Sequence, residues 1–222
     1  MSGSDLTMLV IRFVVLVPAI VFHEVAHGYA AYLLGDTTAK DRGRLSLNPV
    51  KHIDPFGTIL MPLLMVVMFG FGFGYAKPVP VNPHRFKDYR KGMFLTGIAG
   101  PAANLLLAMV AGIAARALDL FGGALGAVGG YAWLFFFYFC LMNLVLMFFN
   151  LIPIPPLDGS RVVPLFLSDR AMRAYAKWER YGFVIVFGLI FFGPRLFGFD
   201  PIGVYFAWTV EPLLRLFAGA GF

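Results

Sequence analysis

Long apolar stretches alternate with short polar segments along this chain. A membrane-spanning helix needs about 20 predominantly apolar residues, and several stretches reach or approach that length. The clearest of them cover residues 6–34, 93–118, 131–151 and 181–197. A shorter C-terminal helix is predicted over residues 202–217, with an interruption at Pro212. The pattern predicts an all-α polytopic membrane protein with about four to six transmembrane helices.

Three other segments are predicted to fold differently. Residues 57–74 are apolar but contain Pro62 and a run of alternating glycines, so we expect a re-entrant or interfacial segment that enters and leaves on one side. A full crossing is the alternative, because about 18 residues can just span a bilayer. Residues 43–48 and 77–82 resemble short strands bounded by turn formers, which predicts β-hairpin strands beside the polar positions of the first span.

The composition agrees with a membrane protein. Hydrophobic residues make up 59% of the chain and charged residues 14%, which excludes an ordinary soluble domain and intrinsic disorder. Cys140 is the single cysteine, so no intrachain disulfide can form. The net charge of +6 comes from Lys and Arg in short segments between apolar spans, which favours membrane orientation over nucleic-acid binding. We expect the lipid bilayer, and no nucleic acid, as a partner.

The first span carries the pentapeptide His23-Glu24-Val25-Ala26-His27. Residues four apart share one helix face, so both imidazoles can reach one metal ion, while Glu24 lies beside them and can accept a proton from metal-bound water. A catalytic zinc commonly takes three protein ligands and leaves one position to water. Ionisable groups at membrane depth are also costly, which makes a functional role the default reading.

The third ligand has several candidates. Asp158 follows a nearly uncharged span and lies in a Pro-Pro-Leu-Asp-Gly sequence that interrupts the helix. Its alternative role is to cap a helix that begins near Ser160. His52 and Asp54 are weaker candidates, because their loop carries other charges, and His84 is expected to be solvated.

Three motifs in this order resemble the site-2 protease family of intramembrane zinc metalloproteases. They are the His-Glu-Val-Ala-His pentapeptide, Gly100-Pro101-Ala102-Ala103-Asn104, and the stretch from Asn150-Leu151-Ile152-Pro153 to Leu157-Asp158-Gly159. The chain has no room for a PDZ or CBS domain and is similar to a compact, core-only branch. We therefore expect one membrane-embedded domain over 1–222, with a catalytic core over about 6–167 and C-terminal helices over about 170–217.

The resemblance assigns roles to particular residues. His23, His27 and Asp158 would bind one Zn²⁺ per chain, and Glu24 would be the catalytic base. Asn104 would position the substrate or stabilise the oxyanion, although hydrogen bonding between helices explains it equally well. The substrate would be a transmembrane segment of another protein, unwound before cleavage. An extended substrate could pair with residues 43–48 or 77–82, and the alternative is that these segments only pack at the interface.

The metal hypothesis constrains the topology. Both ligand motifs lie near the C-terminal ends of their spans, so the first span and the 131–151 span must run in the same direction. An odd number of crossings must then separate them, and the 93–118 span supplies one. With 57–74 re-entrant, three segments on one side carry 14 of the 18 Lys and Arg residues. The positive-inside rule then places the metal nearer the cytoplasm of a prokaryotic plasma membrane, with Arg161 and the cationic residues of 170–180 at lipid headgroups.

Two other functions are compatible with parts of the sequence. A membrane metal-binding or metal-transport protein could use His and Asp along an ion path, but transport favours polar residues spread over several spans. A catalytically silent scaffold could bind membrane segments, and the intact Glu24 argues against it. An intramembrane zinc endopeptidase is the interpretation that uses all three motifs. The oligomeric state is left open.

Overall fold

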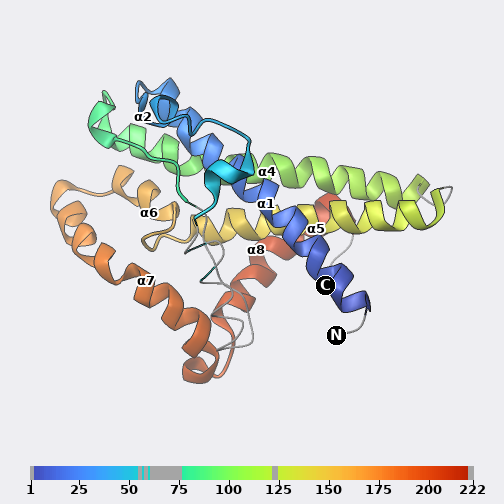
Figure 1. The fold of residues 1–222 in the computed structure, drawn as a ribbon. Helices are drawn as coiled ribbons and strands as arrows, with labels where there is room; N and C mark the ends of the chain where they lie inside the picture. Colours follow the sequence, from blue (N-terminus) through green and yellow to red (C-terminus); the bar gives the residue numbers. More distant parts are fainter. Residues whose placement is uncertain (1–2, 55–56, 58–59, 61–76, 122–124, 220–222) are drawn as a thin grey trace.

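The computed structural model describes residues 3–54, 57, 60, 77–121 and 125–219, and these form an almost entirely helical protein (Figure 1). The long helices are α1 (Gly3–Leu33), α4 (Tyr89–Phe121), α5 (Gly126–Leu151), α7 (Asp169–Phe197) and α8 (Pro201–Ala218). Short turns of helix connect them: α2 (Thr38–Asp41), η1 (Pro49–His52), η3 (Pro83–Arg85), α6 (Gly159–Val162) and η5 (Val163–Leu165).

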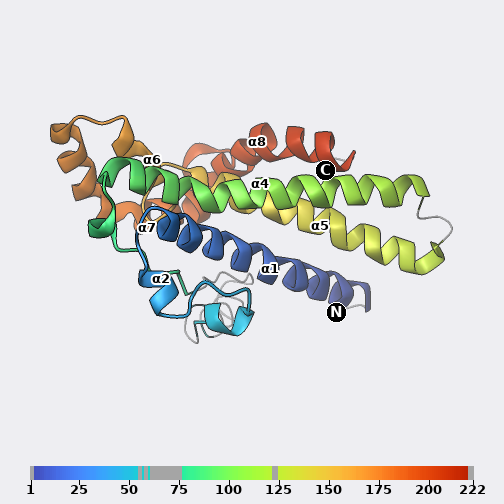
Figure 2. The ribbon, with the colours of Figure 1, turned by 90° about the horizontal axis from the view of Figure 1, so that it is seen from above.

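Four described helices are long and apolar enough to cross a membrane, as the hydropathy pattern predicted. These spans are Val10–Leu33, Tyr89–Phe121, Gly126–Leu151 and Asp169–Phe197. Figure 2 shows α1 and α5 running in one direction, with α4 running in the opposite direction beside them. The metal hypothesis requires this arrangement, because it brings the C-terminal ends of α1 and α5 to the same end of the bundle.

The bundle is held together by small residues on α4. Ala108, Ala111 and Ala115 are buried against Cys140 and Leu144 of α5, and α8 adds its own apolar side chains to the same core. Close approach of helix backbones through small residues is a usual basis of packing in lipid, where no hydrophobic effect drives association. These contacts hold α4 and α5 in the fixed relation on which the polar site depends.

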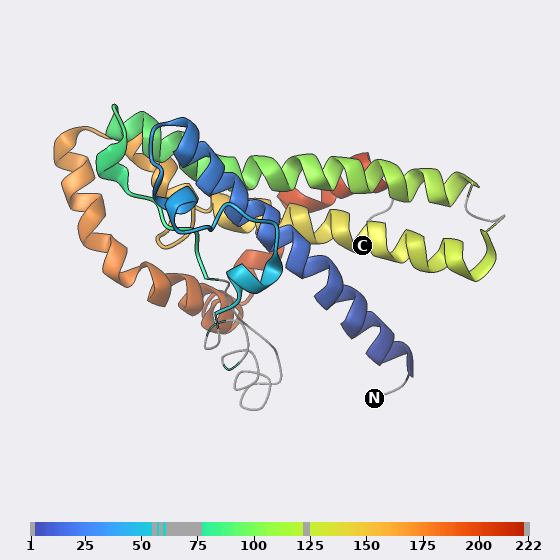
Figure 3. The same ribbon diagram turned by 45° about the horizontal axis from the view of Figure 1, so that its top comes forward.

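The C-terminal helices differ from the prediction in two ways. Helix α7 begins at Asp169, so the charged residues 169–180 form the first part of that helix, and Ser168 caps it by accepting from Ala171 N. Helix α8 continues through Pro212 without the expected interruption. Helix α7 arcs away from the bundle and α8 returns to it (Figures 1 and 3). The site-bearing part of the fold is therefore α1, α4, α5 and the segments between them.

The predicted β-strands are wrong within the described part of the chain. Residues 43–48 form turns and irregular structure, and residues 77–82 are irregular without a strand partner. Pro78 and Pro80 have no N–H to give to a ladder, and neighbouring side chains take backbone groups that a second strand would need. The predicted re-entrant segment 57–74 lies outside the described residues, apart from residues 57 and 60.

Candidate metal centre

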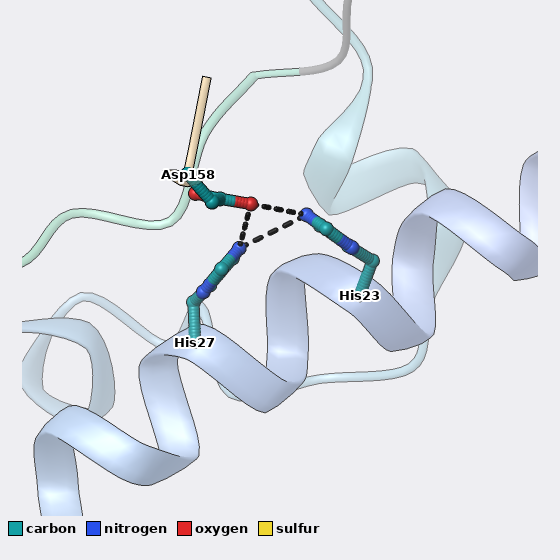
Figure 4. A group of neighbouring side chains, drawn as sticks. All are labelled: His23, His27 and Asp158. Atoms are coloured by element: carbon teal, nitrogen blue, oxygen red, sulfur yellow. Dashed lines mark hydrogen bonds and ion pairs between the residues drawn. The ribbon is translucent and has the colours of Figure 1, made fainter. Parts of the chain in front are cut away.

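Helix α1 directs two imidazoles to the same point. His23 and His27 are one helical turn apart, and both side chains are buried. Their Nε2 atoms lie 2.9 Å apart, although the two rings are almost perpendicular. Figure 4 shows both rings pointing away from the helix axis towards one position. The spacing in the pentapeptide therefore does place two nitrogen ligands together.

Asp158 completes the cluster from a distant part of the chain. Its Oδ2 lies 3.0 Å from the Nε2 atom of His23 and 3.0 Å from that of His27 (Figure 4). Asp158 precedes α6, but its side chain makes no capping hydrogen bond, so the capping interpretation is wrong. A Cβ at Gly159 would lie 2.6 Å from the Ile152 carbonyl oxygen, so the glycine lets this turn fold back on the end of α5.

The ring nitrogens on the far side of each imidazole are also occupied. His23 Nδ1 lies 2.5 Å from Asn104 Oδ1, and His27 Nδ1 lies 2.6 Å from the Thr96 carbonyl oxygen. Both partners are acceptors, so each Nδ1 carries the hydrogen, and a neutral ring presents an unprotonated Nε2 to the cluster. Orientation of this kind by an outer partner is typical of metal-binding histidines.

The donor set fits a divalent metal ion. Two imidazole lone pairs and one carboxylate oxygen converge within 4.8 Å of one another, and without a cation these electron-rich atoms would repel. Burial raises the pKa of the Asp158 carboxyl, but hydrogen bonding and attraction from a protonated His23 or His27 outweigh burial and hold that pKa below its ordinary value. Asp158 is therefore an anion at neutral pH, as a metal ligand has to be.

Asn104 is part of a buried amide relay. Its Nδ2 donates to the Ala19 carbonyl oxygen at 3.2 Å and to Asn143 Oδ1 at 2.7 Å, which fixes Oδ1 towards His23. Asn143 in turn donates to the Phe139 carbonyl oxygen. Both amide hydrogens of Asn104 are used inside the protein, so this conformation leaves none for a substrate oxyanion.

Two residues near the cluster were given no role at the site by the sequence analysis. Asn143 is fully buried. It could have been singled out from the sequence, because its amide side chain lies within an otherwise apolar span. Gly100 lies against both imidazoles, because a Cβ there would overlap His27 Nε2 and lie 2.6 Å from His23 Cε1. The glycine of the Gly-Pro-Ala-Ala-Asn motif thus provides the space that the two rings occupy.

Glu24 has a different environment from the two histidines. Its Oε2 accepts a hydrogen bond of 2.8 Å from the backbone N–H of Val79, and the side chain is only partly buried. This contact joins α1 to residues 77–82, one of the segments expected to form a strand. The glutamate of the pentapeptide is therefore positioned by irregular backbone, whereas the histidines are positioned by helices.

The other candidate residues lie apart from the cluster. His52 is buried, but its Nε2 contacts the Ser46 carbonyl oxygen, and Asp54 Oδ1 accepts from Gly57 N. His84 is exposed, as expected. Arg161, which is predicted to meet lipid headgroups, has its Nη1 3.4 Å from the second carboxylate oxygen of Asp158. Arg161 therefore helps to hold the carboxylate that completes the cluster.

Comparison with known proteins gives consistent matches. The model of "Peptidase family M50" matches residues 117–193. "Putative zinc metalloprotease YwhC" of Bacillus subtilis is 39% identical over 211 residues, covering 92% of this chain and 90% of that protein. "Putative zinc metalloprotease Rip2" of Mycolicibacterium smegmatis is 33% identical over 76% of this chain and 61% of its own length. No solved structure gives a significant match.

Proposed function

Because the chain belongs to peptidase family M50, the site-2 protease family of zinc metalloproteases, we propose that it cleaves a transmembrane segment of another protein. The chain is an integral membrane zinc metalloprotease. The finer proposal is that hydrolysis occurs within or near the membrane, at the His23, His27 and Asp158 cluster. The observation that carries it is the convergence of these three ligand atoms inside a bundle of apolar helices.

His23, His27 and Asp158 would bind one Zn²⁺ per chain through two Nε2 atoms and Oδ2. When bound, Zn²⁺ acts as a Lewis acid that polarises the peptide carbonyl. It also lowers the pKa of water, so that the water can lose a proton near neutral pH and act as the nucleophile. Asn104 and the Thr96 carbonyl hold the two rings in the required tautomer. We assign Asn104 this positioning role in preference to oxyanion binding, because both of its amide hydrogens are already used.

Glu24 would transfer the protons. Peptide hydrolysis requires one proton to leave the attacking water and one to reach the departing amine, and a single carboxylate can do both in turn. Glu24 follows His23 directly on α1, so its carboxylate starts from a backbone position beside the cluster. A partly buried side chain can be reached by water while the ligands around it remain enclosed.

The setting of the cluster supports a membrane substrate. A transmembrane helix hydrogen-bonds its own amides, so it has to unwind locally before a peptide bond reaches the cluster. We place the cluster nearer the cytoplasmic side of a prokaryotic plasma membrane, because the polar segments following α1 and preceding α4 are rich in Lys and Arg. A transport protein would need polar groups along a path, whereas His23, His27, Asp158 and Asn104 gather around one point.

The test of this proposal is Glu24→Gln. The variant keeps the three ligands and removes the base, so we expect zinc content to stay unchanged and cleavage to fall by about 10²- to 10⁴-fold. Cleavage is measured on a panel of single-span fluorogenic substrates in proteoliposomes, with zinc determined by elemental analysis of the same preparation. Glu179→Gln, an exposed glutamate on α7, is the matched control and should behave as wild type. Undiminished cleavage by Glu24→Gln would exclude Glu24 as the base.

A further inference from the structure

Residues 77–82, which we call the strap, lie against α1 next to Glu24. Val79 is buried at the centre of the strap and faces Gly28, which is one helical turn after Glu24. A Cβ at Gly28 would lie 2.6 Å from Val79 Cγ1, so only glycine allows the strap to come this close. The strap therefore contacts α1 on a face that includes the proposed base.

Val79 provides the one backbone donor at the centre of the strap. Pro78 and Pro80 flank it and have no N–H, so the tripeptide has a single hydrogen to donate. That hydrogen goes to Glu24 Oε2 at 2.8 Å. A backbone donor on a proline-flanked residue has little freedom to move, so it can fix one carboxylate oxygen and leave the other available.

The same peptide unit is held on its other side by a buried cation. Arg44 Nη2 donates to the Lys77 carbonyl oxygen at 2.7 Å and to the Pro78 carbonyl oxygen at 3.3 Å. The C=O of Pro78 and the N–H of Val79 belong to one planar peptide group and point in opposite directions. A guanidinium at the oxygen and a carboxylate at the hydrogen polarise this peptide in the same sense, which strengthens both hydrogen bonds.

The far end of the strap is fixed by a buried carboxylate. Asp36 is fully buried after the end of α1, and its Oδ2 accepts from Asn82 N at 2.6 Å. Its Oδ1 accepts from the N–H and the hydroxyl of Thr38. Both Asp36 and Glu24 are anchored in or next to α1, so the strap is fastened at two points to the same element.

We propose that Arg44 and Asp36 are positioning residues for Glu24, acting through the strap. Arg44 holds the Pro78–Val79 peptide from one side, Asp36 fixes the end of the strap, and the Val79 N–H sets the direction of the base. The proposal rests on the assignment of Glu24 as the base. It gives residues 77–82 a role that does not depend on pairing with a second strand.

The experiment compares three variants with two controls. Arg44→Gln and Asp36→Asn remove the interactions that hold the strap, and Val79→Pro removes the N–H while continuing the extended proline run. The matched controls are Arg42→Gln and Asp41→Asn, which change exposed residues of the same type between α1 and η1. Cleavage of the single-span substrate panel gives kcat and KM separately, and zinc content is measured on each preparation.

We expect kcat to fall by about 10- to 100-fold in the three variants, because small misplacements of a reacting group are costly. KM and zinc content should stay within about twofold of wild type, since the metal ligands are held by other helices. Val79→Pro combined with Arg44→Gln should be no slower than the slower single variant, because both act on one hydrogen bond. General structural damage would instead give multiplied losses and reduced zinc content.

Failure of this proposal is distinguishable from failure of the proposed function. If Glu24→Gln abolishes cleavage while Val79→Pro retains the wild-type kcat, the strap does not position the base and only this proposal is overturned. A loss of zinc in Arg44→Gln and Asp36→Asn with normal zinc and kcat in Val79→Pro would likewise overturn it. Activity in Glu24→Gln would remove the base assignment itself.

Discussion

The histidines and the glutamate of one pentapeptide are held by two different regions of the molecule. His23 and His27 are fixed by buried partners on α4, with Asn143 of α5 behind them. Glu24, between them in sequence, is fixed by the backbone of residues 77–82, which are not helical. Helix packing thus orients the proposed metal ligands, and a connecting segment orients the proposed base.

This difference separates two properties of the centre. The ligand region depends on contacts within a helical bundle, where a displaced backbone would disturb many packed side chains at once. The strap depends on a few hydrogen bonds: Arg44 donates to its backbone, and Asp36 and Glu24 accept from its N–H groups. Changes to the bundle should therefore alter metal affinity, while changes to the strap should alter turnover.

The largest effect on the ligand region is expected for Asp158→Ala. Removing the carboxylate leaves two imidazoles, and we expect zinc affinity to fall by more than about 100-fold, beyond the usual cost of losing an outer-sphere partner. Competition with a chelator of known affinity measures this change. Asp119→Ala, an exposed aspartate at the end of α4, should keep wild-type affinity. Unchanged zinc binding in Asp158→Ala would exclude Asp158 as a ligand.

Gly100→Ala should have the next largest effect. The added Cβ would overlap His27 Nε2, so at least one imidazole has to move from its present position. We expect zinc affinity to fall by about 10- to 100-fold, similar to the loss of an outer-sphere partner. Gly130→Ala is the control, because a Cβ at Gly130 meets nothing within 4 Å. Equal affinities in the two variants would show that the rings have more space than the structure gives them.

The smallest effect in this region is expected for Asn143→Leu. The substitution keeps the approximate volume but removes the acceptor that orients Asn104, so we expect zinc affinity to fall by about 10-fold. Asn150→Leu provides the comparison, since Asn150 and Asn143 each donate to the carbonyl four residues earlier, but only Asn143 contacts Asn104. A greater loss of affinity in Asn150→Leu would contradict the relay.

Much of the fold was predictable because lipid imposes strong rules on sequence. The four helices that are long and apolar enough to cross a membrane contain the predicted apolar stretches, and the pairing of His23 with His27 follows from helical spacing. Asp158 could be chosen because carboxylates are rare next to apolar spans. Apolar stretches and helical spacing are local features of the sequence, and the choice of Asp158 depends on the number of membrane crossings. A single sequence is enough to recognise all three.

The parts that the sequence did not show depend on contacts between distant segments. The alternation in 77–82 suggested a strand, but hydrogen bonds from Arg44 and to Asp36 take backbone groups of this segment. Asn104 was expected either to assist catalysis or to hydrogen-bond between helices, and its Nδ2 donates to Asn143 on α5, a partner that the sequence did not indicate. Pairings of this kind arise from tertiary packing, which hydropathy and local motifs do not encode.

If His23 and Asp158 both bind the metal as proposed, their sequence separation of 135 positions would also determine when the enzyme can become active during its biosynthesis. While the ribosome translates the intervening helices, a nascent chain offers a metal ion only two imidazoles, one ligand fewer than a catalytic zinc site commonly uses. The chain would then become able to cleave a substrate only after α5 has been inserted and the following turn has been made. Unfinished copies would therefore be unable to cleave neighbouring membrane proteins.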